Sequence, residues 1–133
     1  KLNVMESLSS DQHKRVVLTL QQVEKAIVQL QEWNKDVTSA DDYLTSPEGA
    51  KNLAANCMMI EAIGESFKKI DNYTQGQLLP LYPSIPWKAV KGIRDHIAHG
   101  YFEIDADIIF ETITENLTPL LTATRFFLEQ LKH

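Results

Sequence analysis

The sequence has little cysteine, few glycines and prolines, and no long hydrophobic run. Cys57 is the single cysteine among 133 residues, so the chain can form neither an internal disulfide nor a cysteine-based zinc site. No apolar run approaches the roughly 20 residues that a membrane-spanning helix needs, and residues 1–11 lack the apolar centre of a signal peptide. We therefore expect a protein of the reducing cytoplasm that has no contact with membrane.

The sequence also lacks an excess of positive charge. The formal net charge is −5, which argues against the broad basic surface of a general nucleic-acid binder. The charge is unevenly placed, however, because residues 84–101 sum to +2 and residues 102–118 sum to −5. Such a distribution favours a small local site for an anion beside an acidic segment.

The remaining composition is that of one globular domain spanning residues 1–133, with 44% hydrophobic and 23% charged residues. Strand signals are nearly absent, whereas helical spacing is widespread. We predict helices over residues 11–33, 46–70, 86–98 and 105–132, with a polar loop or short turn at 36–45. The fold class is therefore all-α, an antiparallel up-and-down bundle of four to five helices.

Local signals support these helices. The first has an apolar stripe and can be capped by Ser9 or Ser10, and Ser46 followed by Pro47 is a typical helix start. Gly64 inside the second helix predicts a close contact between helices. The apolar positions expected to face the core are Val16, Leu20, Val23, Ile27 and Leu30 in the first helix, Leu53, Cys57, Ile60, Ile63, Phe67 and Ile70 in the second, and Ile109, Ile113, Leu117, Leu120, Leu121, Phe127 and Leu131 in the last.

One aspartate and one proline are expected to shape the last predicted helix. Asp105 can cap its start. Pro119 lies inside the helix and is expected to kink or split it, because proline has no N–H to donate.

The third predicted helix carries the residues of chemical interest. A helical wheel places Arg94 inside its apolar arc, where a guanidinium is costly unless it is paired. One interpretation is an ion pair with Glu61 or Glu65 on the second helix. The other is an arginine held at a helix or subunit seam to bind phosphate.

His99 is expected to end this helix, directly before Gly100. Asp95 lies four residues earlier on the same face, where its carboxylate would orient the imidazole and favour the protonated form. The simpler interpretation is a histidine that interacts favourably with the helix dipole. A metal site built from His96, His99 and Glu103 is a weak third possibility, because an i, i+3 histidine pair needs a firm third ligand.

Taken in order, these elements resemble a known family. Arg94, Asp95, His99 and Tyr101 match the Arg-polar-x-x-x-His-x-Tyr signature of the HepT-like toxins, small all-α ribonucleases of the HEPN superfamily. The sequence Ile-Gly-Glu-Ser at 63–66 is similar to an element of that family's second long helix. The Pro-x-Ile-Pro-Trp lead-in at 83–87 is similar as well, and so are the acidic start and central proline of the last helix.

The resemblance implies an activity and a set of residue roles. Arg94 would hold the scissile phosphate, His99 would act as general acid or base, and Asp95 would orient the site. Attack by the ribose 2′-hydroxyl would give 2′,3′-cyclic phosphate ends without a metal or other cofactor. Further candidates for contact with RNA are Lys88, Lys91 and His96.

The resemblance also implies partners. It implies a homodimer, in which the motifs of the two chains form one composite cleft. The usual partner of family members is an MNT-type nucleotidyltransferase antitoxin, which would neutralise this chain by adding AMP to Tyr101. The alternative from a different class is a noncatalytic HEPN-type module that binds a nucleotide or accompanies a nucleotidyltransferase. Substitution of His99 by alanine would separate the two: it should abolish cleavage by an enzyme, whereas it should leave the binding of a noncatalytic module largely intact.

Overall fold

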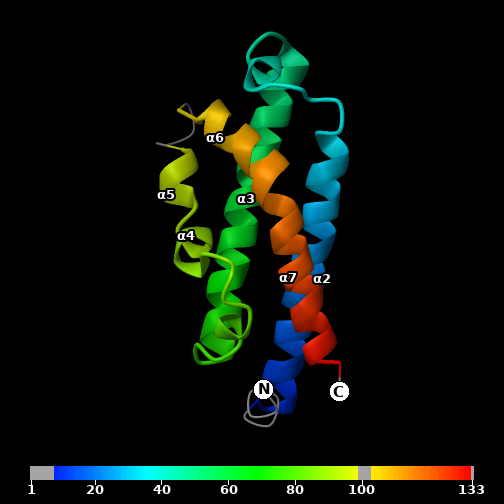
Figure 1. Cartoon of the computed structure of the whole chain (residues 1–133), viewed down its shortest axis with the longest axis vertical. Helices are drawn as coiled ribbons and strands as arrows, with labels where there is room; N and C mark the ends of the chain where they lie inside the picture. Colours follow the sequence, from blue (N-terminus) through cyan, green and yellow to red (C-terminus); the bar gives the residue numbers. More distant parts are fainter. Residues whose placement is uncertain (1–7, 99–102, 133) are drawn as a thin grey trace.

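The computed structural model describes residues 8–98 and 103–132. Helices α2 (Ser10–Trp33) and α3 (Pro47–Tyr73) run beside a third rod made of α6 (Ala106–Glu111), the π-helical segment η3 (Thr112–Asn116) and α7 (Leu117–Gln130) (Figure 1). The short helices α4 (Trp87–Lys91) and α5 (Arg94–Ile97) pack on α3. Within the described residues the sole β pairing is an isolated antiparallel bridge between Ala98 and Ile104. The all-α prediction is confirmed.

The ends of the two long helices form as their sequences predict. Ser9 caps α2 in a capping box, in which its Oγ accepts from the backbone N of Gln12 at 3.1 Å and Gln12 Oε1 accepts from the backbone N of Ser9 at 3.0 Å. Ser46 Oγ likewise accepts from the backbone N of Gly49 at 2.9 Å, with Pro47 as the first residue of α3. The apolar positions predicted for all three long helices are buried.

The segment between α2 and α3 is more ordered than the predicted loop. It contains the short 3-10 helix η1 (Ala40–Tyr43), in which the Tyr43 side chain is buried. The Tyr43 hydroxyl donates to Asn34 Oδ1 at 2.7 Å, and Asn56 Nδ2 donates to the same oxygen at 2.8 Å. Burial raises the pKa of the Tyr43 hydroxyl to about 12. A polar cluster therefore joins α2, η1 and α3, and the apolar pattern gave no signal for it.

The last rod accommodates its proline without a break. Asp105 caps α6, since its Oδ1 accepts from the backbone N of Ile108 at 3.1 Å. The helix continues through Pro119, and its irregular part is the π-helical segment η3, which directly precedes the first turn of α7. A wider turn at this point suits a residue that cannot donate to the preceding turn. The predicted kink or split at Pro119 is thus replaced by a π turn just before it.

In the described part of the chain, no helix has the length and apolar character that crossing a membrane would require. The connection from α3 to α4 includes the 3-10 helix η2 (Leu79–Leu81), whose Leu79 is buried. This connection returns the chain along α3, so that the predicted site segment lies beside that helix (Figure 1).

Candidate functional site

The segment predicted as one helix over residues 86–98 is two short helices. α4 ends at Lys91, Gly92 is its C-cap, and α5 begins at Arg94. Across the junction the backbone N of Ile93 donates to the carbonyl of Val90 at 3.3 Å, a three-residue step in place of the four-residue step of an α-helix. The prediction of one continuous helix is wrong here, and a glycine at the junction is the local reason.

This junction changes the position of Arg94. The helical wheel assumed a single phase from Trp87 onwards and placed Arg94 on the buried arc. With the phase shifted, the Arg94, Asp95 and His96 side chains are exposed, while Ile97 is buried at 0% exposure. The interpretation of Arg94 as a buried guanidinium is therefore wrong.

The ion pair considered for Arg94 is not formed either. Among residues 8–98 and 103–132 no salt bridge involves Arg94. Glu65 pairs with Lys68 along α3 at 3.0 Å, and Glu61 accepts a weak hydrogen bond from the Cys57 thiol at 3.7 Å. Within the described structure Arg94 thus presents an exposed cation suited to an external anion.

Cys57 adds no nucleophile to this region. Its side chain is buried in the core, and burial raises the pKa of the Cys57 thiol to about 11. The thiol is the unreactive form, so at neutral pH the residue acts as a small apolar side chain.

Aromatic packing fixes the start of the site segment. The Trp87 ring lies 5.0 Å from the Phe67 ring on α3 and 5.6 Å from the Phe127 ring on α7, centroid to centroid. Its Nε1 donates to the carbonyl of Tyr82 at 2.9 Å. Because Trp87 is the first residue of α4, the helix begins from a fixed point. Lys88 follows with an exposed side chain.

Gly64 fixes the middle of the segment. A Cβ at this position of α3 would lie 2.8 Å from the carbonyl oxygen of Val90 and 2.9 Å from Cγ2 of Ile93. Real Cβ atoms do not approach so closely, so α3 admits α4 at this distance only because residue 64 has no side chain. The predicted close contact at Gly64 is confirmed, and its partner is the junction that precedes Arg94.

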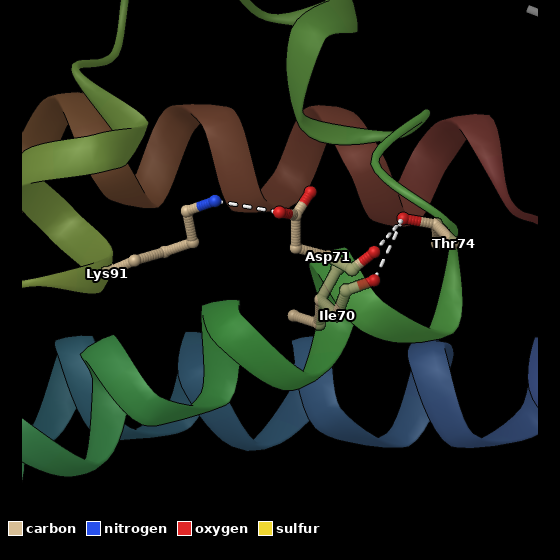
Figure 2. A network of polar contacts seen from close by, with 4 residues as sticks. All are labelled: Ile70, Asp71, Thr74 and Lys91. Carbon is tan, nitrogen blue, oxygen red and sulfur yellow. Dashed lines mark hydrogen bonds and ion pairs between the residues drawn. The ribbon is translucent and has the colours of Figure 1, made fainter.

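An ion pair fixes the end of α4. Lys91 Nζ lies 2.7 Å from Asp71 Oδ2, and the two side chains point toward each other (Figure 2). The two side chains are 30% and 25% exposed. Lys91, a predicted RNA contact, therefore has an intramolecular partner, whereas the candidates Lys88 and His96 are exposed.

The second half of the motif lies outside the described residues. These positions are His99 and Tyr101, so the predicted contact of His99 with Asp95 stays a prediction. The flanks of the undescribed stretch are described: Ala98 pairs with Ile104, and the backbone N of Asp105 donates to the carbonyl of Ile97 at 2.9 Å. The start of α6 is thereby tied to the end of α5.

No cluster of three or more potential metal ligands occurs within residues 8–98 and 103–132. The weakly predicted set of His96, His99 and Glu103 includes a residue outside that range, so it stays a prediction. The described acidic residues Glu103, Asp105 and Asp107 are exposed, which places negative charge at the start of α6, beside the end of α5.

A cavity of about 310 Å³ lies between α3, α4 and the η3–α7 rod, and sequence reasoning missed it. Gly64 and Ile93 both line it, so it adjoins the junction before Arg94. No local pattern could reveal it, because its walls come from segments that lie far apart in the sequence. Most of its lining is apolar: Ile60, Ile63, Gly64, Ser84, Ile85, Pro86, Ala89, Val90, Ile93, Thr112, Asn116, Leu117, Pro119 and Leu120.

Comparison with known proteins points in the same direction as the motif. The family model described as "Ribonuclease HepT-like" matches residues 23–126. A protein of Thermococcus cleftensis named "Probable ribonuclease HepT" is 29% identical over 101 residues, which cover 76% of this chain and 84% of that protein. A "Putative RNase" of Caldanaerobacter subterraneus subsp. tengcongensis is 30% identical over 94 residues, which cover 71% and 78%. No solved structure gives a significant match.

Proposed function

The chain belongs to the HepT-like ribonuclease family, and we propose from this membership that it is an endoribonuclease and the toxin of a toxin–antitoxin pair. The observation that carries the proposal is the family match over residues 23–126, which includes the whole segment from Arg94 to Tyr101. The exposed Arg94 on a firmly held short helix supports it, because phosphate recognition requires an accessible cation in a fixed place.

The proposed reaction is a transesterification within RNA. A base removes the proton of the ribose 2′-hydroxyl, O2′ bonds to the adjacent phosphorus, and the bond from phosphorus to the 5′ oxygen breaks. That oxygen takes up a proton, which leaves a 2′,3′-cyclic phosphate and a 5′-hydroxyl. DNA is resistant because it has no 2′-hydroxyl.

Three residues have separate roles in the proposed reaction. Arg94 holds the phosphate and stabilises the charge that develops on its oxygens. His99 transfers the protons, a role that contributes roughly 10²–10⁴ in rate. Asp95, next to Arg94 and exposed like it, orients His99.

Lys88 and His96 extend the RNA contact, since both are exposed on the same short segment. In the proposed homodimer two such segments face one cleft. The duplicated Lys88 and Arg94 then supply local positive charge despite the chain's net charge of −5. Lys91 adds little to the positive charge of this cleft, because its charge is balanced by that of Asp71.

The proposed regulation is covalent. An MNT-type nucleotidyltransferase antitoxin in the same cytoplasm transfers the AMP group of ATP to Tyr101: the hydroxyl loses its proton, its oxygen bonds to the α-phosphorus, and pyrophosphate leaves. A bulky anionic group two residues from His99 then blocks RNA by size and by repulsion.

The first prediction tests the activity itself. Purified protein is incubated with total tRNA and with mRNA in EDTA, beside Arg94→Ala, His99→Ala and the control Arg15→Ala, which removes an exposed arginine from α2. We expect wild type and Arg15→Ala to leave cyclic-phosphate ends. The two motif variants are expected to lose on the order of 10²-fold or more in rate, because each removes a group that acts in the transition state.

Two results would contradict the proposal. Cleavage that persists in both motif variants would show that the motif is not the active site. Absence of cleavage by folded wild type of unmodified mass would instead favour the noncatalytic nucleotide-binding module. An intact mass raised by one AMP unit would identify a toxin that is already neutralised.

A further inference from the structure

The ion pair between Lys91 and Asp71 differs from the other ion pairs in the described chain. Four of those join residues only three apart in the sequence, within a helix or just past its end, and their side chains are about half exposed or more. The fifth, Arg125 with Glu24, joins α7 to α2 with the arginine 55% exposed. The Lys91–Asp71 pair links two helices with both side chains at least 70% buried. Lower exposure weakens screening by solvent, so this pair has the most favourable setting.

The Asp71 end of the pair is braced. Asp71 lies in the last turn of α3, and its carbonyl accepts from the backbone N of Gly76 at 2.9 Å. Thr74 Oγ1 donates to the carbonyls of Ile70 at 2.8 Å and Asp71 at 3.4 Å (Figure 2). These bonds close the end of α3, so the Asp71 carboxylate extends from a fixed backbone toward α4.

The Lys91 end lies where support matters for the site. Lys91 is the last residue of α4, and Arg94 opens α5 three residues later, beyond the junction. Arg94 itself has no ion pair among the described residues and its side chain is exposed. Its location is therefore set by the backbone of the junction, which Gly64 contacts and Lys91 ties to α3.

We infer that Asp71, acting through Lys91, is a positioning residue that holds the α4–α5 junction so that Arg94 meets the scissile phosphate. The inference rests on the proposed ribonuclease function. Asp71 touches no reacting group, and its effect comes from the 2.7 Å pair.

The sequence-based interpretation of Lys91 as an RNA contact makes the opposite prediction. If Lys91 bound phosphate directly, replacing Asp71 by asparagine would remove a competing anion and strengthen RNA binding. If Lys91 supports Arg94, the same replacement releases the end of α4 and slows the chemistry. The sign of the Asp71→Asn effect therefore separates the two roles.

The experiment measures kcat and KM on a single-stranded RNA for wild type, Asp71→Asn, Lys91→Met and the exchanged pair Asp71→Lys with Lys91→Asp. We expect each single variant to lose roughly tenfold in kcat, since small misplacements of a catalytic group are costly. KM should stay within about twofold, and its dependence on salt should be unchanged because no phosphate contact is lost. The exchanged pair should recover most of the rate.

Glu48→Gln is the matched control. It removes one negative charge from the other end of α3, where Glu48 pairs with Lys51 at 80% exposure or more, and it should leave kcat unchanged. Thermal unfolding of every variant shows that the rates refer to folded protein, and Lys91→Met, which breaks the same pair from its other end, serves if Asp71→Asn does not fold.

The outcomes separate this inference from the function it rests on. Folded wild type of unmodified mass that cuts no RNA overturns both. Active wild type with Asp71→Asn as fast or faster, or an exchanged pair that recovers nothing, overturns the positioning role alone. A raised KM and a shallower salt dependence in Lys91→Met alone would make Lys91 an RNA contact.

Discussion

Arg94 opens a helix of four residues, with Asp95 and His96 exposed beside it. An exposed arginine is inexpensive to hold and available to an anion, whereas a buried one would need a partner of its own. The fold keeps Arg94 in place through its neighbours: Ile97 is buried at 0% exposure, and the partly buried Ile93 packs against Gly64. The apolar residues on either side thus fix the backbone from which the guanidinium extends.

Tyr101 provides a test of the proposed regulation. Phenylalanine at this position keeps the ring and removes the hydroxyl that would accept AMP. We therefore expect Tyr101→Phe to cleave RNA like wild type and to arrest growth even when the antitoxin is co-expressed. Growth curves and the intact mass of the purified protein are the measurements.

The contrasting results are informative. If Tyr101→Phe loses cleavage, the hydroxyl takes part in the reaction. If the variant cleaves RNA but the antitoxin still neutralises it, modification of this tyrosine is not the means of control.

At the scale of elements, the site depends on how α4 and α5 lie against α3. Trp87 anchors the first residue of α4, Gly64 contacts the junction, and Lys91 ties the last residue of α4 to Asp71. Three different kinds of contact thus act on seven consecutive residues, 87–93. Two short helices of such length would not hold a conformation by themselves, so these tertiary contacts define the segment.

Gly64→Ala tests this arrangement. Alanine favours the helix by up to about 1 kcal/mol, but its Cβ would meet the carbonyl oxygen of Val90 at 2.8 Å, and a backbone atom has little freedom to move aside. Overpacking costs about 1–3 kcal/mol, so we expect a net loss in stability of about 0–2 kcal/mol. The displaced junction should lower RNA cleavage by roughly tenfold or more. Urea unfolding and the cleavage rate measure the two effects.

Gly49→Ala is the control for general destabilisation. It places a Cβ against the carbonyl of Asp42 in η1, away from the α4–α5 segment. Its folded fraction should cleave RNA at the wild-type rate. An equal loss of rate in both variants would mean that Gly64 acts through overall stability and not through the junction.

At the scale of the whole molecule, a buried polar cluster joins α2, η1 and α3. Asn34 and Asn56 exchange side-chain hydrogen bonds at 2.8 and 2.9 Å, and Asn34 Oδ1 also accepts from Tyr43 and from Asn52. Asn56 is 0% exposed, and in the described residues no buried side-chain polar atom lacks a partner. A fully satisfied cluster of this kind favours one register of the helices over its alternatives.

The cluster predicts a difference between two asparagines. Asn56→Ala removes both bonds with Asn34 inside the core, so we expect a loss of about 2–4 kcal/mol in the free energy of unfolding. Asn52→Ala removes a part-buried bond of 3.2 Å to Asn34 and an exposed bond of 3.4 Å to the carbonyl of Trp33, and it should cost less than about 1 kcal/mol. The midpoint of urea unfolding at an unchanged slope measures both. Equal costs would mean that the cluster adds nothing beyond its individual bonds.

Local information in the sequence determined the helices and the family. The helix caps and the apolar stripes depend only on residues within one or two turns, so they can be predicted from the sequence. The caps are Ser9, Ser46 and Asp105. The motif that carries the family resemblance is likewise a matter of order and spacing.

Only the tertiary structure decided how the site segment is built. The junction at Gly92, the exposure of Arg94 and the pairing of Lys91 with Asp71 depend on contacts with α3, whose residues lie about 20 or more positions away. A helical wheel assumes one uninterrupted helix. It therefore placed Arg94 on the wrong face, because the helix is interrupted where Ile93 packs against Gly64. A segment whose helices are shorter than two turns takes its conformation from the surface it packs on, and that surface is assembled only by folding.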